Sequence, residues 1–168
     1  MTMRQILLNS CARAATAAEA RFRIDVPIAP SRAARVVALD EGAEPVVRRV
    51  AGQHWASARF FTYRSLAPAA DAVADLLLRS TDGAESWLSE QLDGADVAVM
   101  IATANDGAEA ASAIGNACTL RGIMTAGLVL ADGHDTAAAV AALRPHARVL
   151  MVTHDEIDVS EVLTALRA

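Results

Sequence analysis

Residues 95–133, which read ADVAVMIATANDGAEAASAIGNACTLRGIMTAGLVLADG, decide the predicted fold of this chain. They contain an apolar run at 96–103, a polar turn, a helix of small residues at 107–120 and a second apolar run at 122–130. A strand that is apolar on both faces is typical of the centre of a parallel sheet covered by helices. The stretch therefore predicts one unit of strand, helix and strand.

Strands and helices alternate on both sides of this unit. The predicted elements are a strand at 35–39, a helix from Glu44 with Pro45 in its first turn, a strand at 58–63, amphipathic helices at 68–80 and 84–92, a helix at 135–143, a strand at 147–153 and a helix at 159–167. Such alternation implies parallel strands joined by right-handed crossovers. We expect a three-layer, Rossmann-like (doubly wound) α/β fold with about five mainly parallel strands, in the order 3-2-1-4-5 or 2-1-3-4-5.

The length of 168 residues and an apolar fraction of 54% are sufficient for one hydrophobic core. Pro27 and Pro30 require an extended or looped backbone just before the first predicted strand. We expect residues 1–34 to be an N-terminal helix and extended arm, and residues 35–168 to be the Rossmann-like domain. Whether the arm packs on that domain or reaches a neighbour stays open.

The composition excludes several classes of function. All 15 basic residues are arginine, so the lysine of a Schiff-base enzyme or of a P-loop is absent. The net charge of −5 gives no basic face for DNA or RNA, and no apolar run is long enough to span a membrane. We therefore expect neither nucleic acid nor membrane as a partner.

The cellular compartment follows from the N-terminus and the cysteines. The apolar run after Arg4 has only three residues before Asn9, which is shorter than the core of a secretory signal. Cys11 and Cys118 form neither a disulfide framework nor a metal-binding motif. These features favour the cytoplasm.

In an open parallel sheet, ligands bind beyond the carboxyl ends of the strands, where the strand order reverses. The leading hypothesis is a non-catalytic or weakly catalytic domain for a small, nucleotide-like molecule, with no assigned cofactor. Amides at Gly42 and Gly107 would contact the ligand, and Asn105 would add side-chain hydrogen bonds. The predicted ligand-binding residues are Asp40, Gly42, Thr103, Asn105, Asp106, Gly107, Asp132 and His134.

Two alternatives belong to other classes. In a metal-assisted enzyme, Asp40, Asp106 and Asp132 would hold Mg²⁺ and His134 would be a general base. In a homo-oligomeric assembly protein, a sheet edge, the N-terminal arm and the surfaces around two tryptophans, Trp55 and Trp87, would pair copies of the chain. The helical spacing of Trp87 with Leu88 and Leu92 favours a core position for Trp87. The acids would equally serve as helix caps without any ligand.

Residues 94–130 resemble the nucleotide-binding half of the tubulin and FtsZ GTPase family. Gly94, Ala95 and Asp96 precede the strand at 97–101, and 115–121 and 122–130 match the following helix and strand. Residues 36–50, with Gly42, weakly resemble that family's first strand, glycine loop and helix. The resemblance implies a Rossmann-like nucleotide-binding fold.

The phosphate loop differs from the pattern of that family. Its glycine-threonine-glycine motif is replaced by TANDGAE at 103–109, which keeps Gly107 and adds Asp106 and Glu109. Glycines allow backbone amides to approach phosphate closely, whereas carboxylates repel it. The resemblance thus implies a degenerate, non-hydrolysing relative, and convergence on a common βαβ arrangement would give the same pattern.

A second resemblance is to phosphosugar domains of the sugar-isomerase type. In those domains a Ser/Thr-rich loop at the end of a strand is followed by a glycine and a glutamate at a helix start. Thr103, Asn105, Gly107 and Glu109 are loosely similar to that arrangement.

Overall fold

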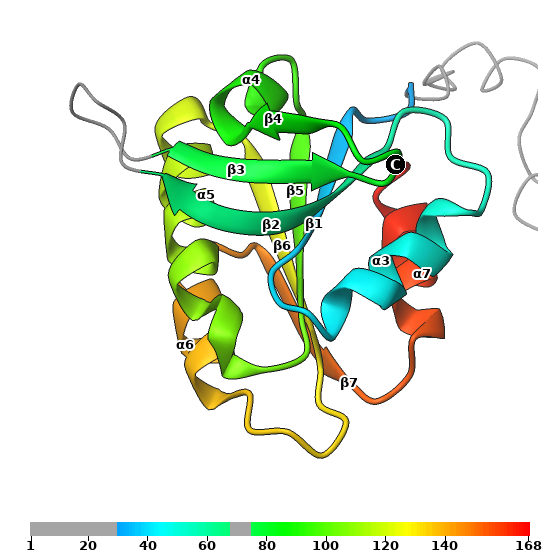
Figure 1. The fold of residues 1–168 in the computed structure, drawn as a ribbon. Coiled ribbons are helices and arrows are strands. Elements are labelled where there is room, and N and C mark those ends of the chain that lie inside the picture. The colour runs from blue at the N-terminus through cyan, green and yellow to red at the C-terminus, as the bar shows by residue number, and fades with distance from the viewer. Residues whose placement is uncertain (1–29, 68–74) are drawn as a thin grey trace, which may run out of the picture. The chain divides into compact units, whose positions relative to one another are not determined.

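The computed structural model describes residues 30–67 and 75–168, and Ser31–Ala168 forms one compact unit. A twisted sheet lies between two layers of helices in this unit (Figure 1). The predicted three-layer α/β architecture is therefore confirmed. The arm predicted at 1–34 falls outside the described residues up to residue 29. None of the described helices is long and apolar enough to cross a membrane.

Five strands of the sheet are parallel. They are β1 (Ala34–Ala38), β2 (Arg59–Ala67), β5 (Val97–Ala102), β6 (Met124–Leu130) and β7 (Val149–Thr153). Their spatial order is β2-β1-β5-β6-β7, with β1 and β5 adjacent. This is the second of the two predicted orders. The strand order reverses between β1 and β5, which defines the switch point of the sheet.

The sheet has seven strands, because a hairpin extends it beyond β2. The helix predicted at 68–80 is wrong over its described part, since Asp75–Ser80 forms β3, antiparallel to β2. Buried Leu76 and Leu78 alternate there with more exposed residues, which is the period of a strand. Residues 68–74 of the predicted helix lie outside the described part.

The segment at 84–92 is only partly helical. It begins with β4 (Glu85–Trp87), which pairs with β3, and then forms the short helix α4 (Leu88–Leu92). Leu88 and Leu92 are buried, but Trp87 is 39% exposed. The predicted core position of Trp87 is therefore wrong, because its backbone belongs to an edge strand and not to the apolar face of a helix.

Helices cover both faces of the sheet (Figure 1). α3 (Ala43–Ala51) and α7 (Ile157–Ala165) pack on the face that carries Val36 and Val99. α5 (Ala108–Arg121) and α6 (Ala137–Leu143) pack on the face that carries Val37 and Met100. Successive residues of the central strands thus enter opposite cores, which explains why β1 and β5 are buried throughout.

Candidate functional site

Asp40 connects the two loops of the switch point. Its Oδ2 accepts hydrogen bonds from the amides of Thr103 (2.7 Å) and Ala104 (3.1 Å). Its Oδ1 accepts from the Thr103 hydroxyl (2.6 Å) and from the amide of Ala43 (2.9 Å). Only 9% of Asp40 is exposed. The loops after β1 and β5 are therefore tied together by one carboxylate.

This arrangement changes the expected chemistry of the switch point. Amides at the end of a strand and the start of a helix are the groups that bind ligand anions in sheets of this kind. Here the amides of Thr103, Ala104 and Ala43 already donate to an anion that belongs to the protein. A phosphate at the same place would have to displace the Asp40 carboxylate and would be repelled by it.

The two glycines predicted to contact a ligand are required for packing. A Cβ on Gly107 would lie 2.5 Å from the Cβ of Leu39, and Gly107 is buried. A Cβ on Gly42 would lie 2.2 Å from the Thr103 Oγ1. Close approach of the two loops is sufficient to explain both glycines without a ligand.

Asn105 and Asp106 lie in η1 (Asn105–Gly107), the short 3-10 turn before α5. The Asn105 Oδ1 accepts hydrogen bonds from the amides of Ala138 (2.8 Å) and Ala139 (3.2 Å), so Asn105 caps α6. Asp106 is exposed and makes no side-chain hydrogen bond within the described residues. The turn that was predicted to bind a ligand therefore connects η1 with α6 through Asn105.

Asp132 and His134 lie in the exposed loop between β6 and α6, and neither side chain contacts a hydrogen-bonding partner in the described ranges. In residues 30–67 and 75–168 no three His, Cys, Asp or Glu side chains are grouped so that they could hold a metal ion. The predicted Mg²⁺ set of Asp40, Asp106 and Asp132 is therefore not assembled. Asp40 is also committed to main-chain amides, so the metal-assisted enzyme loses its ligands.

The other polar residues at this edge stabilise their own loops. Asp135 accepts from the amide of Ala137 (3.0 Å), and Asp155 accepts from the amide of Ile157 (2.9 Å). Glu156 forms a two-point ion pair with Arg49 of α3. Helix capping and ion pairing account for these three acidic residues without a ligand.

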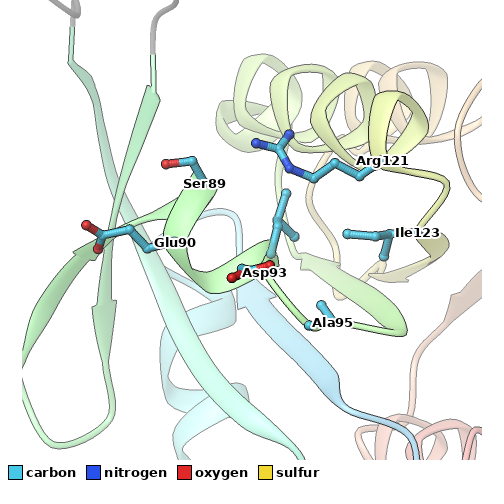
Figure 2. A pocket seen from close by; sticks show the side chains of 8 residues that line it. Ser89, Glu90, Asp93, Ala95, Arg121 and Ile123 are labelled. Carbon is cyan, nitrogen blue, oxygen red and sulfur yellow. The ribbon is translucent and has the colours of Figure 1, made fainter.

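A pocket of about 700 Å³ lies beside α4 and the end of α5 (Figure 2). Arg121 lies across the pocket from Ser89 and Asp93 in this view. The Ser89 hydroxyl donates to Asp75 (2.5 Å), and the Arg121 Nη1 donates to the carbonyl of Ala117 (3.1 Å). Two of its polar side chains are thus engaged with the protein itself.

A second groove, of about 530 Å³, lies at the sheet edge opposite the switch point, where β2 begins. We call it the arginine groove, and it is lined by residues of the loop before β2, of β2 itself, of the β3–β4 hairpin and of α4, among them Trp55, Arg59, Phe61, Ser86 and Gln91. Its size is that of a small-molecule site.

Arg59 lines this groove, and Arg35 lies beside Arg59 without lining the groove. Arg35 of β1 is in register with Arg59 of β2, so both side chains are on the same face. Arg35 is only 7% exposed; its Nε donates to the carbonyl of Gln91 (2.7 Å) and its Nη1 to that of Ala34 (3.3 Å). Among the described residues, no carboxylate lies within ion-pair distance of Arg35 or Arg59.

The surroundings of Arg35 disfavour its charge. Burial lowers the pKa of Arg35, and the neighbouring Arg59 lowers this pKa further, while Asp96 acts in the opposite direction. An arginine nevertheless stays protonated in proteins. A buried positive charge, that of Arg35, therefore lies beside Arg59, which lines the groove.

Neutral groups complete the arginine groove. The Oε1 of Gln91 is buried and has no hydrogen-bond partner within the described chain. Trp55 is held in place because its Nε1 donates to the carbonyl of Val50 (2.8 Å) and its ring packs beside Phe60. The lining of the groove thus combines an aromatic side chain in a fixed position with an amide oxygen that accepts no hydrogen bond from the described residues.

None of the predicted site residues lies in the arginine groove. The sequence feature that pointed towards this groove was Arg35, a charged residue in the otherwise apolar run 35–39. Its significance depends on the β1–β2 register, because only this register places Arg59 beside it. No local sequence pattern encodes that pairing.

The chain matches no protein-family model, and comparison with curated proteins and with solved structures found no significant match.

Proposed function

We propose that this chain is a non-catalytic binding domain for a small organic anion, which lies in the arginine groove with its acidic group against Arg59, next to the buried Arg35. One observation carries the proposal: the guanidinium groups of two adjacent strands share a face without a carboxylate partner in the described residues. The proposed ligand site therefore lies at the end of the strands opposite the switch point, and not at the switch point itself.

The physical argument concerns the burial of charge. Taking a guanidinium out of water costs several kilocalories per mole unless an opposite charge compensates. The two carbonyls that accept hydrogen bonds from the Nε and Nη1 of Arg35 do not neutralise its charge, and Arg59 adds repulsion. A carboxylate or phosphate in the groove would offset both effects, since guanidinium groups bind these anions through paired hydrogen bonds.

The lining residues restrict the rest of the ligand. Trp55 and Phe61 offer apolar surface, which favours a flat or apolar portion. A nucleotide belongs to this class, and so does an aromatic carboxylate.

The proposal includes no reaction. The groove has one acidic lining residue, Asp82, whose carboxylate accepts hydrogen bonds from Ser80 and from the amide of Ala84. No histidine or cysteine is among the lining residues of the described part. A Ser–His or Cys–His pair, which activates the nucleophile in many enzymes, is therefore missing from this set.

Trp55 is a built-in reporter of binding. In a Trp87→Phe background, its fluorescence would be titrated with inorganic phosphate, a nucleoside monophosphate and an aromatic carboxylate. We expect a saturable change with at least one of the two organic anions. Arg59→Gln should weaken binding about tenfold or more, because a charge-assisted hydrogen bond is lost.

Arg144→Gln is the matched control, since Arg144 is also exposed and lies after α6, far along the sheet from β2. It removes the same charge and should leave the affinity unchanged. The proposal fails if no anion produces a saturable response, or if Arg59→Gln binds as tightly as the Arg144→Gln control.

A further inference from the structure

We propose that β7 pairs in antiparallel fashion with β7 of a second copy of this chain, so that two sheets join into one across a twofold axis. The inference does not depend on the arginine groove. β7 is the last strand at one end of the sheet, and the groove lies at β2, β3 and β4 towards the other end.

β7 is an apolar edge strand. Within the described residues it pairs only with β6, and its sequence VLMVT contains no charge. Val149 is 41% and Val152 is 52% exposed. An edge strand presents unpaired amides and carbonyls, and proteins usually protect such an edge with charges or keep it very short. The opposite edge is protected in this way, because β4 has three residues and begins with Glu85.

The exposed side chains lie on both faces of the β7 edge. Met151 packs against the core under α3 and α7, and Leu150 packs against the core under α5 and α6. Because side chains alternate, Val149 shares a face with Met151, and Val152 shares a face with Leu150. A strand added at this edge would cover apolar side chains on both faces of the sheet, whereas a helix would cover those on one face only.

Charge complementarity selects a second copy as the occupant. Arg144 and Arg148 lie before β7, and Asp155 follows it, with Asp132 and Asp135 in the neighbouring loop. Antiparallel pairing brings the basic end of one strand beside the acidic end of the other, twice. Such a surface is complementary to itself, as a twofold interface requires.

The alternation of faces also restricts the register. A twofold axis normal to the sheet places the same face of both copies on the same side. The numbers of two paired residues must therefore differ by an even number, because side chains alternate between the faces. A register centred on Met151 pairs Leu150 with Val152 of the second copy and places Arg148 near His154 and Asp155 of that copy. This register buries Val152 in the interface and brings Arg148 of one copy close to Asp155 of the other.

The test is the oligomeric state of the full chain, measured by sedimentation equilibrium over a wide concentration range. We expect the wild type to dimerise and Val152→Lys to remain monomeric where the wild type is dimeric. Val152 is half-exposed, so the variant should fold, which far-ultraviolet circular dichroism would check. Leu120→Lys is the matched control: Leu120 is 87% exposed on α5 and lines a groove beside β3 and α4. It should dimerise as the wild type does.

A monomeric wild type overturns the proposal, including the case in which residues 1–29 of the same chain cover β7. Dimerisation of Val152→Lys with wild-type affinity also overturns it. As a second variant, Arg148→Asp should weaken the dimer, and this weakening should diminish at high salt, because the new repulsion from Asp155 of the second copy is screened. An unchanged affinity of Arg148→Asp contradicts the register.

Discussion

The carboxylate of Asp40 accepts hydrogen bonds from both the amide and the hydroxyl of Thr103, at 2.7 and 2.6 Å, across 63 residues of sequence. This contact closes the switch point. Asp40→Ala would leave the amides of Thr103, Ala104 and Ala43 without their acceptor. We expect a loss of about 2 to 4 kcal/mol in the free energy of unfolding, measured by urea denaturation. Asp106→Ala, at an exposed position of the same edge, should change it by less than about 0.5 kcal/mol.

Gly107 is predicted to tolerate no side chain, for reasons of space alone. A methyl group there would meet the Cβ of Leu39 at 2.5 Å and its carbonyl oxygen at 3.0 Å. Gly107→Ala should therefore lower the free energy of unfolding by about 1 to 3 kcal/mol. Gly52→Ala, in a helical conformation and with its nearest neighbour at 3.3 Å, is the control and should change it by less than about 1 kcal/mol. Equal losses in both variants would contradict the packing argument.

The ion pair between Glu156 and Arg49 should make stability depend on pH. The Arg49 hydrogen bond lowers the pKa of Glu156, burial opposes this, and the charge of Arg49 lowers it further. A lowered carboxyl pKa stabilises the folded state above the pKa of the unfolded chain, and this stabilisation is lost as pH falls through the folded value.

Glu156→Gln should therefore melt slightly below the wild type at neutral pH, and the difference should vanish in acid. The effect is small because the Arg49 side chain is 59% exposed and the Glu156 side chain 36% exposed, so that water screens the pair. Glu161→Gln, on the exposed side of α7, should show no such pH-dependent difference. Thermal melts from neutral to acidic pH measure both variants. If the difference in melting temperature between Glu156→Gln and the wild type persists in acid, it comes from packing and not from the ion pair.

Cys118 should be unreactive in the folded protein. Burial raises the pKa of its thiol to about 11, although Arg121 acts in the opposite direction. At pH 8 only about one thiol in a thousand would be ionised. In a Cys11→Ser background, a thiol reagent should react slowly with the native protein and quickly in denaturant. Fast native reaction would contradict the buried position.

The central fold was predictable because its strands carry a local signal. β5 is apolar throughout and Thr125 is the one polar residue of β6, and a central parallel strand covered on both faces has this composition. The three leucines at 76–78 fit helical spacing as well as strand alternation. Pairing with β2 decides in favour of a strand, and such pairing depends on distant residues.

The candidate sites were predictable only in part. Asp40 and Thr103 were placed at the same edge by the order of elements, but their direct contact depends on the approach of two loops. Asn105 was expected to hold a ligand and instead caps α6, since the position of α6 is set by tertiary packing. Arg35 and Arg59 become a pair only through the register of β1 and β2.

The side-chain Nε–Hε resonances of the arginines test the central claim most directly. In an NMR titration with a nucleoside monophosphate and with an aromatic carboxylate, the account predicts that Arg35 and Arg59 shift together and saturate with one or both ligands, while Arg144 does not move. Unchanged Arg35 and Arg59 resonances with both ligands, or equal shifts of all three arginines, would contradict an anion site in the arginine groove.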